Sequence, residues 1–501
     1  SEMCIRDRLK SKQTVFCKVN ALFYKEISPP DVISYLLDKN KYVLKGEDLM
    51  YKVSTLADEY KKKLVTADEA VAIVKPGDRV HYGTGCGSPV DLDEAMARRA
   101  DSLKDVHILS CITIRKAPSK LYLATQSNDQ VRFESAHFSG ADRKMCKEGR
   151  CWYIPMNFNE LPSYWVGNDC GIDVAMFQVT PMDQNGNFNL GPQVSDMRGV
   201  IEGAKKIIVE VNENMPLAQG FQTQVNLADV DYIVEGSNET LAELPTKGAT
   251  EIDRQIAAHV VERISSDSTL QLGIGGLPNC IGQMLADSDV KNISGHTEML
   301  VDAYVELFNA GKLTNNKAIN KGSLVYTFAG GTKKLYDFID GNPICCNAPV
   351  DYVNNVDVIA SMDNFVSVNS CIQVDLYGQV CSESGGYQQI SGTGGQLDFV
   401  MGAYHSKGGQ SFICTPSTRT LKDGTKESLI APVLTPGSIV TTPRSATHMI
   451  VTEYGVANLK GKSTWERAEL LINVAHPDFR EDLIKAAEKN GIWKNTSKCT
   501  F

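Results

Sequence analysis

A short apolar run leads directly into a glycine turn in residues 269–278 (TLQLGIGGLP), and this order decides the fold. A helical pattern of apolar residues follows through Ile281 and Leu285, and a strand-like run lies at residues 290–293. Pro278 suits the first turn of a helix, where its missing N–H costs no hydrogen bond. Strand, turn, helix and strand in this order predict one unit of a mostly parallel sheet.

The same order occurs earlier in the chain. Residues 78–89 (DRVHYGTGCGSP) read as a strand and a glycine turn, and a helix over residues 90–100 and a strand over residues 106–109 are expected next. The chain therefore looks as if it is built twice. We expect an α/β fold of two related open α/β domains with mostly parallel sheets. Further strands are expected at residues 173–179, 206–211, 230–234, 324–328, 356–361, 365–368 and 411–415.

Length sets the domain organisation. At 501 residues, the chain exceeds the roughly 250 to 300 residues that one hydrophobic core supports, so two domains are expected. A polar stretch begins at residue 238, and a helix is expected over residues 253–265. We therefore place the boundary near Gly248, between an N-terminal domain at residues 51–248 and a C-terminal domain at residues 249–501.

Charge and cysteine content exclude several classes of protein. The net charge of −9 and the pI near 5.5 leave no basic stripe for a phosphate backbone, so nucleic acid is not an expected partner. The fourteen cysteines are scattered, without a CxxC pair or a metal-ligand spacing. We interpret them as reduced thiols of a cytoplasmic protein without a metal site. Apolar runs fall short of the roughly 20 residues that cross a bilayer, so no membrane partner is expected.

Residues 1–49 require a separate interpretation. The chain opens on Ser1 and carries basic residues near its start, without clear periodicity or the apolar core of a signal peptide. Regular helical patterning begins after Met50. We therefore expect residues 1–49 to be a leader that is not native, and an organellar presequence is the alternative.

A second glycine turn lies at residues 391–396 (SGTGGQ) and precedes the helix-like residues 397–401. Glycine turns at helix starts expose backbone N–H groups that can hold an anionic ligand or a developing oxyanion. The first glycine turn, residues 273–278, lacks the third glycine of the dinucleotide fingerprint and the lysine of a P-loop. A structural tight turn is the alternative there.

Glu298 lies between the two glycine turns in the sequence, in residues 296–299 (HTEM). A carboxylate held near two such turns can attack a carbonyl group bound there. An apolar helical stretch is expected from Met299 to a stop near Gly311. The alternative is therefore that Glu298 only complements the helix dipole, with Thr297 as the N-cap.

Other polar side chains are also candidates. His137 lies in a polar loop and can line a site, and His81 and His296 can reach the same cleft if the halves face each other. Glu453 follows an apolar run and is expected at a strand end. The alternatives are a hydrogen-bonded loop histidine for His137 and a cap or salt bridge for Glu453.

Five motifs carry a family resemblance. They are GIGGLPN at residues 273–279, HTEM at 296–299, DLYGQV at 375–380, QISGTGGQLDF at 389–399 and VTEYG at 451–455. They resemble the family I CoA-transferases of the acetyl-CoA hydrolase/transferase group, most closely butyryl-CoA:acetate CoA-transferases, with 4-hydroxybutyrate CoA-transferases as near relatives. The resemblance runs from about Tyr51 almost to Phe501. It implies two related halves of the NagB/RpiA-like type, with the active site between them.

The resemblance also implies residue roles. It makes Glu298 the nucleophile that becomes a glutamyl-CoA thioester. The residues that it implies for binding CoA or the acyl oxygen are Gly273, Ile274, Gly275, Gly276, Leu277, Gly394, Gly395, Lys422 and Ile372. A solvated loop lysine is the alternative for Lys422.

The implied reaction moves CoA between a short-chain acyl-CoA and a carboxylate, as when butyryl-CoA and acetate give butyrate and acetyl-CoA. CoA is then a substrate and part of a covalent intermediate, and no permanently bound cofactor or metal is expected. A homodimer or homotetramer is also implied. The alternatives are a 4-hydroxybutyrate or propionate CoA-transferase, an acyl-CoA hydrolase on the same scaffold, a nicotinamide-dependent oxidoreductase and a non-catalytic binding protein. The missing third glycine disfavours the oxidoreductase.

Overall fold

The computed structural model describes residues 46–126, 130–167, 170–244 and 248–494, with side chains from residue 55 onward. The chain divides into two units, residues 1–59 and residues 60–501. Residues 46–59 of the first unit belong to helix α3 (Gly46–Lys63). The rest of the expected leader, residues 1–45, lies outside the described residues. The elements below belong to residues 60–501.

The first half contains a seven-stranded sheet in the order β4-β3-β2-β1-β5-β7-β9, and its neighbouring strands run parallel. The strands of this half are β1 (Arg79–Thr84), β2 (Val106–Cys111), β3 (Val131–Ser135), β4 (Cys151–Tyr153), β5 (Ile172–Val179), β6 (Asn187–Asn189), β7 (Ala204–Val211), β8 (Gln224–Asn226) and β9 (Tyr232–Glu235). The helices are α4 (Ala67–Val71), α5 (Asp91–Arg98), α6 (Lys120–Ala124), α7 (Gly140–Lys147), α8 (Leu161–Val166) and α9 (Met197–Gly203). Short 3-10 turns are η1 (Gly85–Gly87), η2 (Ala100–Ser102), η3 (Phe158–Glu160) and η4 (Leu227–Asp229).

The second half contains an eight-stranded sheet in the order β13-β12-β11-β10-β14-β19-β23-β24. β24 runs antiparallel to β23, and the other neighbouring strands run parallel. The strands of this sheet are β10 (Thr269–Leu272), β11 (Ser294–Leu300), β12 (Leu324–Ala329), β13 (Cys345–Asn347), β14 (Phe365–Ser370), β19 (Gln410–Cys414), β23 (Met449–Thr452) and β24 (Gly455–Asn458).

Smaller sheets and helices complete the second half. The short strands are β15 (Gln373–Asp375), β16 (Val380–Cys381), β17 (Ser384–Gly385), β18 (Gln388–Gln389), β20 (Thr418–Thr420), β21 (Lys426–Ser428) and β22 (Ile430–Ala431). The helices are α10 (Glu251–Val261), α11 (Gly276–Asp287), α12 (Asp302–Asn309), α13 (Lys333–Ile339), α14 (Val350–Val353), α15 (Val356–Ala360), α16 (Gln396–His405), α17 (Thr464–Asn473) and α18 (Pro477–Lys489).

The two large sheets share one strand order, which confirms that the chain is built twice. β1 and β10 hold the same central place, between β2 and β5 in the first sheet and between β11 and β14 in the second. A glycine-containing turn and a helix follow each of these central strands. The expected fold, two related open α/β units with mostly parallel sheets, is therefore correct.

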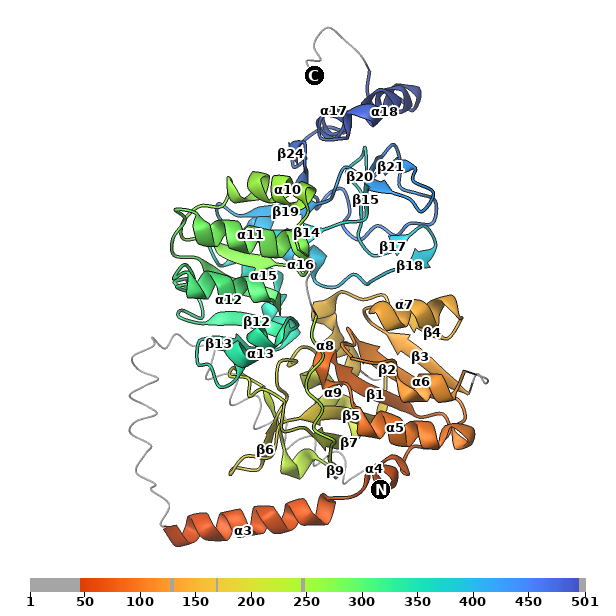
Figure 1. Cartoon of the computed structure of the whole chain (residues 1–501), viewed down its shortest axis with the longest axis vertical. Helices are drawn as coiled ribbons and strands as arrows, with labels where there is room; N and C mark the ends of the chain where they lie inside the picture. The colour runs from red at the N-terminus through yellow and green to blue at the C-terminus, as the bar shows by residue number, and fades with distance from the viewer. Residues whose placement is uncertain (1–45, 127–129, 168–169, 245–247, 495–501) are drawn as a thin grey trace. The chain divides into compact units, whose positions relative to one another are not determined.

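The strands read as apolar runs because both faces of each sheet are covered. β10 and β12 are buried along their whole length, as parallel strands with helices on both faces must be. Helices α10, α11 and α12 lie next to one another along the second sheet (Figure 1). A capping box of Thr250 and Asp253 starts α10, because each side chain bonds a backbone N–H that the first helical turn leaves unpaired.

Several sequence predictions agree closely with the structure. The run at residues 269–272 is β10, the expected helix over residues 253–265 is α10, and the strand expected at residues 324–328 is β12. The boundary near Gly248 lies in the connection between the two large sheets and stays a prediction, since the structural division falls after residue 59 instead.

Two of the expected strands are wrong. In the run expected at residues 356–361, Val356–Ala360 form helix α15, because the side chain of Asn355 accepts hydrogen bonds from the N–H groups of Asp357 and Val358 and so caps a helix start. The strand expected at residues 290–293 begins later, at Ser294. Asn292, with φ of 59°, holds the left-handed conformation that interrupts an extended run.

The element that carries Glu298 was also misread. Met299 belongs to strand β11, and the helix that follows, α12, begins at Asp302. Glu298 is therefore not a residue at a helix start, and Thr297 is not an N-cap. A buried parallel strand and a buried helix give similar short apolar runs, so periodicity alone does not separate them.

Candidate active site

A cavity of about 720 Å³ has Glu298 in its wall, and we call it the Glu298 cavity. The second half lines it with residues at the carboxyl ends of β10, β11, β12 and β14. The first half adds residues 112–118 after β2 and residues 137–141 after β3. The strand order reverses at β10, and open parallel sheets bind ligands at the carboxyl ends of their strands at such a point.

The carboxylate of Glu298 meets two hydrogen-bond donors. Nδ2 of Asn354 lies 2.7 Å from Oε2 of Glu298, and the backbone N–H of Gly395 donates to the same carboxylate. Burial raises the pKa of Glu298 to about 7, and these two bonds hold the rise back by favouring the charged form. Near neutral pH the group is therefore divided between its acid and its anion, and the anion is the nucleophilic form.

Gly395 lies closer to this carboxylate than any other residue type would permit. A Cβ atom there would collide with Nδ2 of Asn354 and Oε2 of Glu298. Gly394 has φ of 54°, in the left-handed region that favours glycine. The structure thus brings Glu298 together with Gly394 and Gly395.

The first half of the chain holds the second glycine turn, residues 391–396, in place. The hydroxyl of Tyr153 accepts a hydrogen bond of 2.8 Å from the N–H of Thr393. The N–H of Phe158 donates to the carbonyl of Gly394 at 3.2 Å, and that of Phe138 donates to the carbonyl of Ser391 at 3.3 Å. The turn that supports Glu298 therefore depends on contacts made across the two halves.

The first glycine turn, residues 273–278, contributes its first two residues to the cavity lining. Gly273 and Ile274 line the Glu298 cavity, and the side chain of Ile274 is 48 % exposed. Gly275 is the N-cap of α11 with φ of 123°, and Gly276 and the buried Leu277 begin that helix. The first N–H groups of a helix lack intrahelical partners, so this turn can bind an anionic ligand.

A second buried carboxyl group lies beside Glu298. Burial, together with the nearby charge of Glu298, raises the pKa of Asp398 to about 8. Asn354 is a neighbour of both carboxyl groups, since it bonds Glu298 and also the side chain of Asp398. Oδ2 of Asp398 has no hydrogen-bond partner among the described residues. Two carboxylates so close cannot both ionise freely, so the ionisation of one raises the pKa of the other.

The three histidine candidates have different environments. His137 lines the Glu298 cavity, and burial together with the charge of Arg143 lowers its pKa to about 4. A ring nitrogen of His296 lies 2.7 Å from the carbonyl oxygen of Val353. His81 packs edge-on against Trp165. His81 and His296 are not among the residues that line the cavity.

The remaining candidates lie away from the cavity lining. Glu453 follows strand β23, as expected, and accepts hydrogen bonds from the N–H of Ser417 at 2.9 Å and from its hydroxyl at 2.6 Å. Lys422 is exposed in the turn between β20 and β21. Ile372 is half-buried between β14 and β15, where its N–H donates to the carbonyl of Cys381. The contacts of Lys422 and Ile372 with CoA stay predictions.

Sequence reasoning missed three residues that support Glu298 or its neighbouring glycine turn and lie far from Glu298 in the sequence. Asn354 ends the short helix α14, Asp398 lies in the first turn of α16, and Tyr153 ends strand β4. Nothing in the local sequence marks Asn354 or Tyr153, because their roles depend on the packing of distant segments. Asp398 lies inside the QISGTGGQLDF motif, which was the available signal.

Two features are absent from the described residues. Within residues 46–494, apart from the short gaps, no group of three or more His, Cys, Asp and Glu side chains is arranged to hold a metal ion. In the same part of the chain, no helix has both the length and the apolar character that crossing a bilayer requires.

Comparisons with known proteins place the chain in a family of enzymes. The chain matches the acetyl-CoA hydrolase/transferase N-terminal domain over residues 49–245 and the C-terminal domain over residues 331–487. The chain therefore belongs to the acetyl-CoA hydrolase/transferase family, as its motifs indicated.

Individual relatives agree with this assignment. The chain is 50% identical to the butyryl-CoA:acetate CoA-transferase of Anaerostipes caccae, over 88% of this chain and 99% of that protein. It is 41% identical to the 4-hydroxybutyrate coenzyme A transferase of Clostridium kluyveri, over 86% of this chain and 98% of that protein. The crystal structure of RipA from Yersinia pestis superposes with a TM-score of 0.80 at 36% identity, covering 87% of this chain and 99% of RipA.

Proposed function

We propose that this enzyme moves CoA between a short-chain acyl-CoA and a carboxylate acceptor, with Glu298 as the nucleophile. The observation that carries the proposal is the position of the Glu298 carboxylate, which borders a large cavity and contacts the N–H of Gly395 and the amide of Asn354. A buried carboxylate with a pKa of about 7 is available as an anion at neutral pH, yet little water solvates it.

The chemistry follows from that position. An oxygen of Glu298 attacks the thioester carbonyl, the C–S bond breaks, and CoA leaves as a thiolate while Glu298 and the acyl group form a mixed anhydride. The thiolate then attacks the glutamyl carbonyl and releases the first carboxylate, which leaves CoA on Glu298 as a thioester. An incoming carboxylate reverses both steps and departs as the new acyl-CoA. The thioester bond energy is conserved, so the cycle uses neither ATP nor a metal.

Backbone N–H groups supply the electrostatic part of the mechanism. Each tetrahedral intermediate carries an oxyanion, and a fixed N–H beside the reacting carboxylate, such as that of Gly395, stabilises it without reorganisation. The anhydride hydrolyses readily, so the cavity must exclude water while CoA is bound. The N-terminus of α11, behind Gly273 and Ile274, is our proposed site for the anionic groups of CoA.

The covalent intermediate is the direct test. Brief incubation with butyryl-CoA is expected to add the mass of CoA to the peptide that contains Glu298, and borohydride is expected to prevent or remove the adduct. Glu298→Gln should show neither adduct nor acyl exchange. Glu306→Gln, at a surface glutamate paired with Lys334, is the matched control and should behave as the unchanged enzyme. Exchange that persists in Glu298→Gln would refute the proposed nucleophile.

A hydrolase on the same scaffold makes a different prediction. If water resolved the glutamyl thioester, butyryl-CoA alone would release free thiol at the full rate. We expect rapid acetyl-CoA formation only when acetate is present, with little thiol release in its absence. Fast release without any carboxylate would favour the hydrolase.

Butyryl-CoA and acetate are our proposed substrate pair, which the similarity to the Anaerostipes caccae enzyme supports. The similarity to the Clostridium kluyveri enzyme makes 4-hydroxybutyrate the second acceptor to test. Rates with acetate, propionate, butyrate and 4-hydroxybutyrate at equal concentrations rank the acceptors.

We also propose a cytoplasmic enzyme that forms a homodimer or homotetramer and binds no permanent cofactor. Its domains are proposed to meet near Gly248. Light scattering on the purified protein tests the assembly, and separate expression of residues 51–248 and 249–501 tests the boundary.

A further inference from the structure

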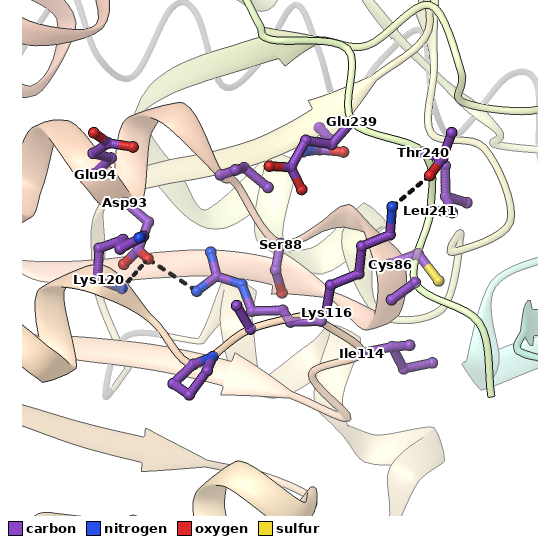
Figure 2. A pocket seen from close by; sticks show the side chains of 16 residues that line it. Cys86, Ser88, Asp93, Glu94, Ile114, Lys116, Lys120, Glu239, Thr240 and Leu241 are labelled. Carbon is purple, nitrogen blue, oxygen red and sulfur yellow. Dashed lines mark hydrogen bonds and ion pairs between the residues drawn. The ribbon is translucent and has the colours of Figure 1, made fainter. Parts of the chain in front are cut away.

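A second cavity adjoins the Glu298 cavity. It has a volume of about 240 Å³, and we call it the Asp93 cavity. Figure 2 shows its two ends: Ile114, Cys86 and Leu241 gather at one, and Asp93, Glu94 and Lys120 at the other. The residues that line both cavities form one continuous segment, residues 114–118. This segment is therefore the wall between them.

The apolar part of this wall is a small hydrophobic cluster. Its members Ile112 and Leu244 line the Glu298 cavity, whereas Cys86, Leu241 and Ala242 line the Asp93 cavity. Ile114 belongs to the same cluster and lines both cavities. Among the apolar side chains of this cluster, Ile114 is thus the one that separates the two spaces.

The two charged residues that follow Ile114 in the sequence already have polar partners. The guanidinium group of Arg115 forms an ion pair of 3.0 Å with Asp93, and the ammonium group of Lys116 donates a hydrogen bond to the hydroxyl of Thr240. The backbone of Ile114 is fixed by a bond of 3.1 Å from its N–H to the carbonyl of Gly85. Ile114 therefore presents an apolar side chain from a rigid backbone.

The apolar wall also contacts a residue next to the nucleophile. Met299 follows Glu298 on β11 and lines the same cavity. An ideal Cβ at Gly330 would lie 3.2 Å from Cδ1 of Ile114, 2.9 Å from Cδ1 of Leu244 and 2.5 Å from Cε of Met299. These three side chains thus pack against one point beside Gly330, so the apolar wall at Ile114 extends to Met299, the neighbour of Glu298.

We propose that Ile114 closes the acyl end of the Glu298 cavity and thereby sets the longest acyl chain that the enzyme accepts. The inference rests on the proposed CoA-transferase function and adds a specificity-determining residue to it. The substrate class is straight-chain aliphatic acyl-CoA. A chain too long for the Glu298 cavity meets Ile114, beyond which the Asp93 cavity has room.

Shortening Ile114 tests the proposal. In Ile114→Ala, the two cavities should join, and kcat/KM for hexanoyl-CoA relative to butyryl-CoA should rise about 15-fold, because each of the two additional methylenes contributes a factor of about four when buried. Ile114→Val should shift the ratio in the same direction by less, and it serves as the readout if the alanine variant does not fold. The assay uses acetate as the acceptor and the full-length enzyme.

A matched pair of variants locates the new space. Cys86→Ala enlarges the Asp93 cavity while Ile114 still separates it, so the acyl-chain profile should stay as in the unchanged enzyme. Cys86→Leu combined with Ile114→Ala refills that cavity and should return the hexanoyl preference toward its original value. Both results would place the added methylenes in the Asp93 cavity.

The outcomes distinguish a failure of the proposed function from a failure of the role assigned to Ile114. If the unchanged enzyme transfers CoA from no acyl-CoA, the proposed function fails. If butyryl transfer is normal and neither Ile114→Ala nor Ile114→Val alters the hexanoyl-to-butyryl ratio, the assignment of Ile114 is overturned while the proposed function stands. A raised ratio that Cys86→Leu does not reverse would equally overturn the role of the Asp93 cavity.

Discussion

Asn354 donates a hydrogen bond of 2.7 Å from Nδ2 to Oε2 of Glu298, and it also bonds the side chain of Asp398. One amide thus contacts two buried carboxyl groups whose pKa values are raised to about 7 and about 8. These values describe the pair, since the ionisation of one group opposes that of the other.

Asn354→Ala removes a donor that favours the Glu298 anion, so the pKa of Glu298 should rise. A hydrogen bond to a charged group contributes about 1.5 to 3 kcal/mol, which corresponds to a rise of about one to two pKa units. The acid limb of kcat against pH should move upward by that amount, and the rate at pH 7 should fall about 10-fold or more. Asn316→Ala, at an exposed site, is the control. An unshifted acid limb would contradict this role for Asn354.

Asp398→Asn tests the second carboxyl group. In the unchanged enzyme, activity should rise with pH as Glu298 ionises near 7 and fall as Asp398 ionises near 8, because a second negative charge repels the incoming carboxylate. The asparagine side chain imitates the protonated acid, so the variant should remain active and lose the decline above pH 8.

The pH profile of Asp398→Asn has to be interpreted with the neighbours that alter the pKa of Asp398. These include Glu298, Asn354, Glu160 and the backbone of Asn159. Glu160→Gln is the control for a shift produced by that neighbour alone. An Asp398→Asn enzyme whose alkaline decline is unchanged would assign the decline to another group.

Glu298 should also make folding depend on pH. Its folded pKa of about 7 lies above its ordinary value of 4.5, so its contribution to stability is complete below pH 4.5 and is lost as pH rises through 7. Glu298→Gln cannot ionise, and relative to the unchanged enzyme it should gain about 2 to 3 kcal/mol between pH 4.5 and pH 8. Urea unfolding at pH 5 and pH 8 measures this difference. Equal effects at both pH values would show that burial does not perturb Glu298.

Gly395→Ala should inactivate the enzyme without unfolding it. The added methyl group collides with Asn354 and Glu298. To relieve this collision, the backbone N–H of residue 395 should move away from the carboxylate. Loss of one such donor lowers kcat by about 100- to 1,000-fold. Gly248→Ala, where a Cβ meets no atom within 4 Å, is the control for a glycine replacement as such. Activity within a few-fold of normal would contradict the tight approach.

Gly273→Ala should weaken the binding of acyl-CoA more than it slows the reaction. A Cβ there meets only the carbonyl oxygen of Val368, at 3.9 Å, so the empty protein should keep its stability. Since Gly273 lines the Glu298 cavity, the methyl group should instead occupy space needed by CoA. We expect KM for acyl-CoA to rise about 10-fold with a smaller change in kcat. An unaffected KM would place CoA elsewhere in the cavity.

The sequence predicted the architecture well because its signals are local. The strand that ends at Leu272, the turn at Gly273 to Pro278 and the duplicated order each lie within a short stretch, and the motifs around Glu298 and Gly395 belong to a recognisable family. Local signals failed where two elements share one pattern, as in strand β11 and helix α15.

Long-range partners could not be predicted for a different reason. Asn354 meets Glu298 across 56 positions, and Tyr153 meets Thr393 across 240 positions. Neither residue stands in a motif, and only the packing of the sheets creates these contacts. The role of Ile114 likewise depends on the positions of two cavities, which no sequence pattern indicates.

The contacts from Tyr153, Phe138 and Phe158 to the second glycine turn have a consequence for turnover. Gly395 and Glu298 both belong to the second half, whereas these three bonds come from the first half. The two halves are thus joined directly beside the nucleophile, so a change in the first half can reach the reacting carboxylate without touching it.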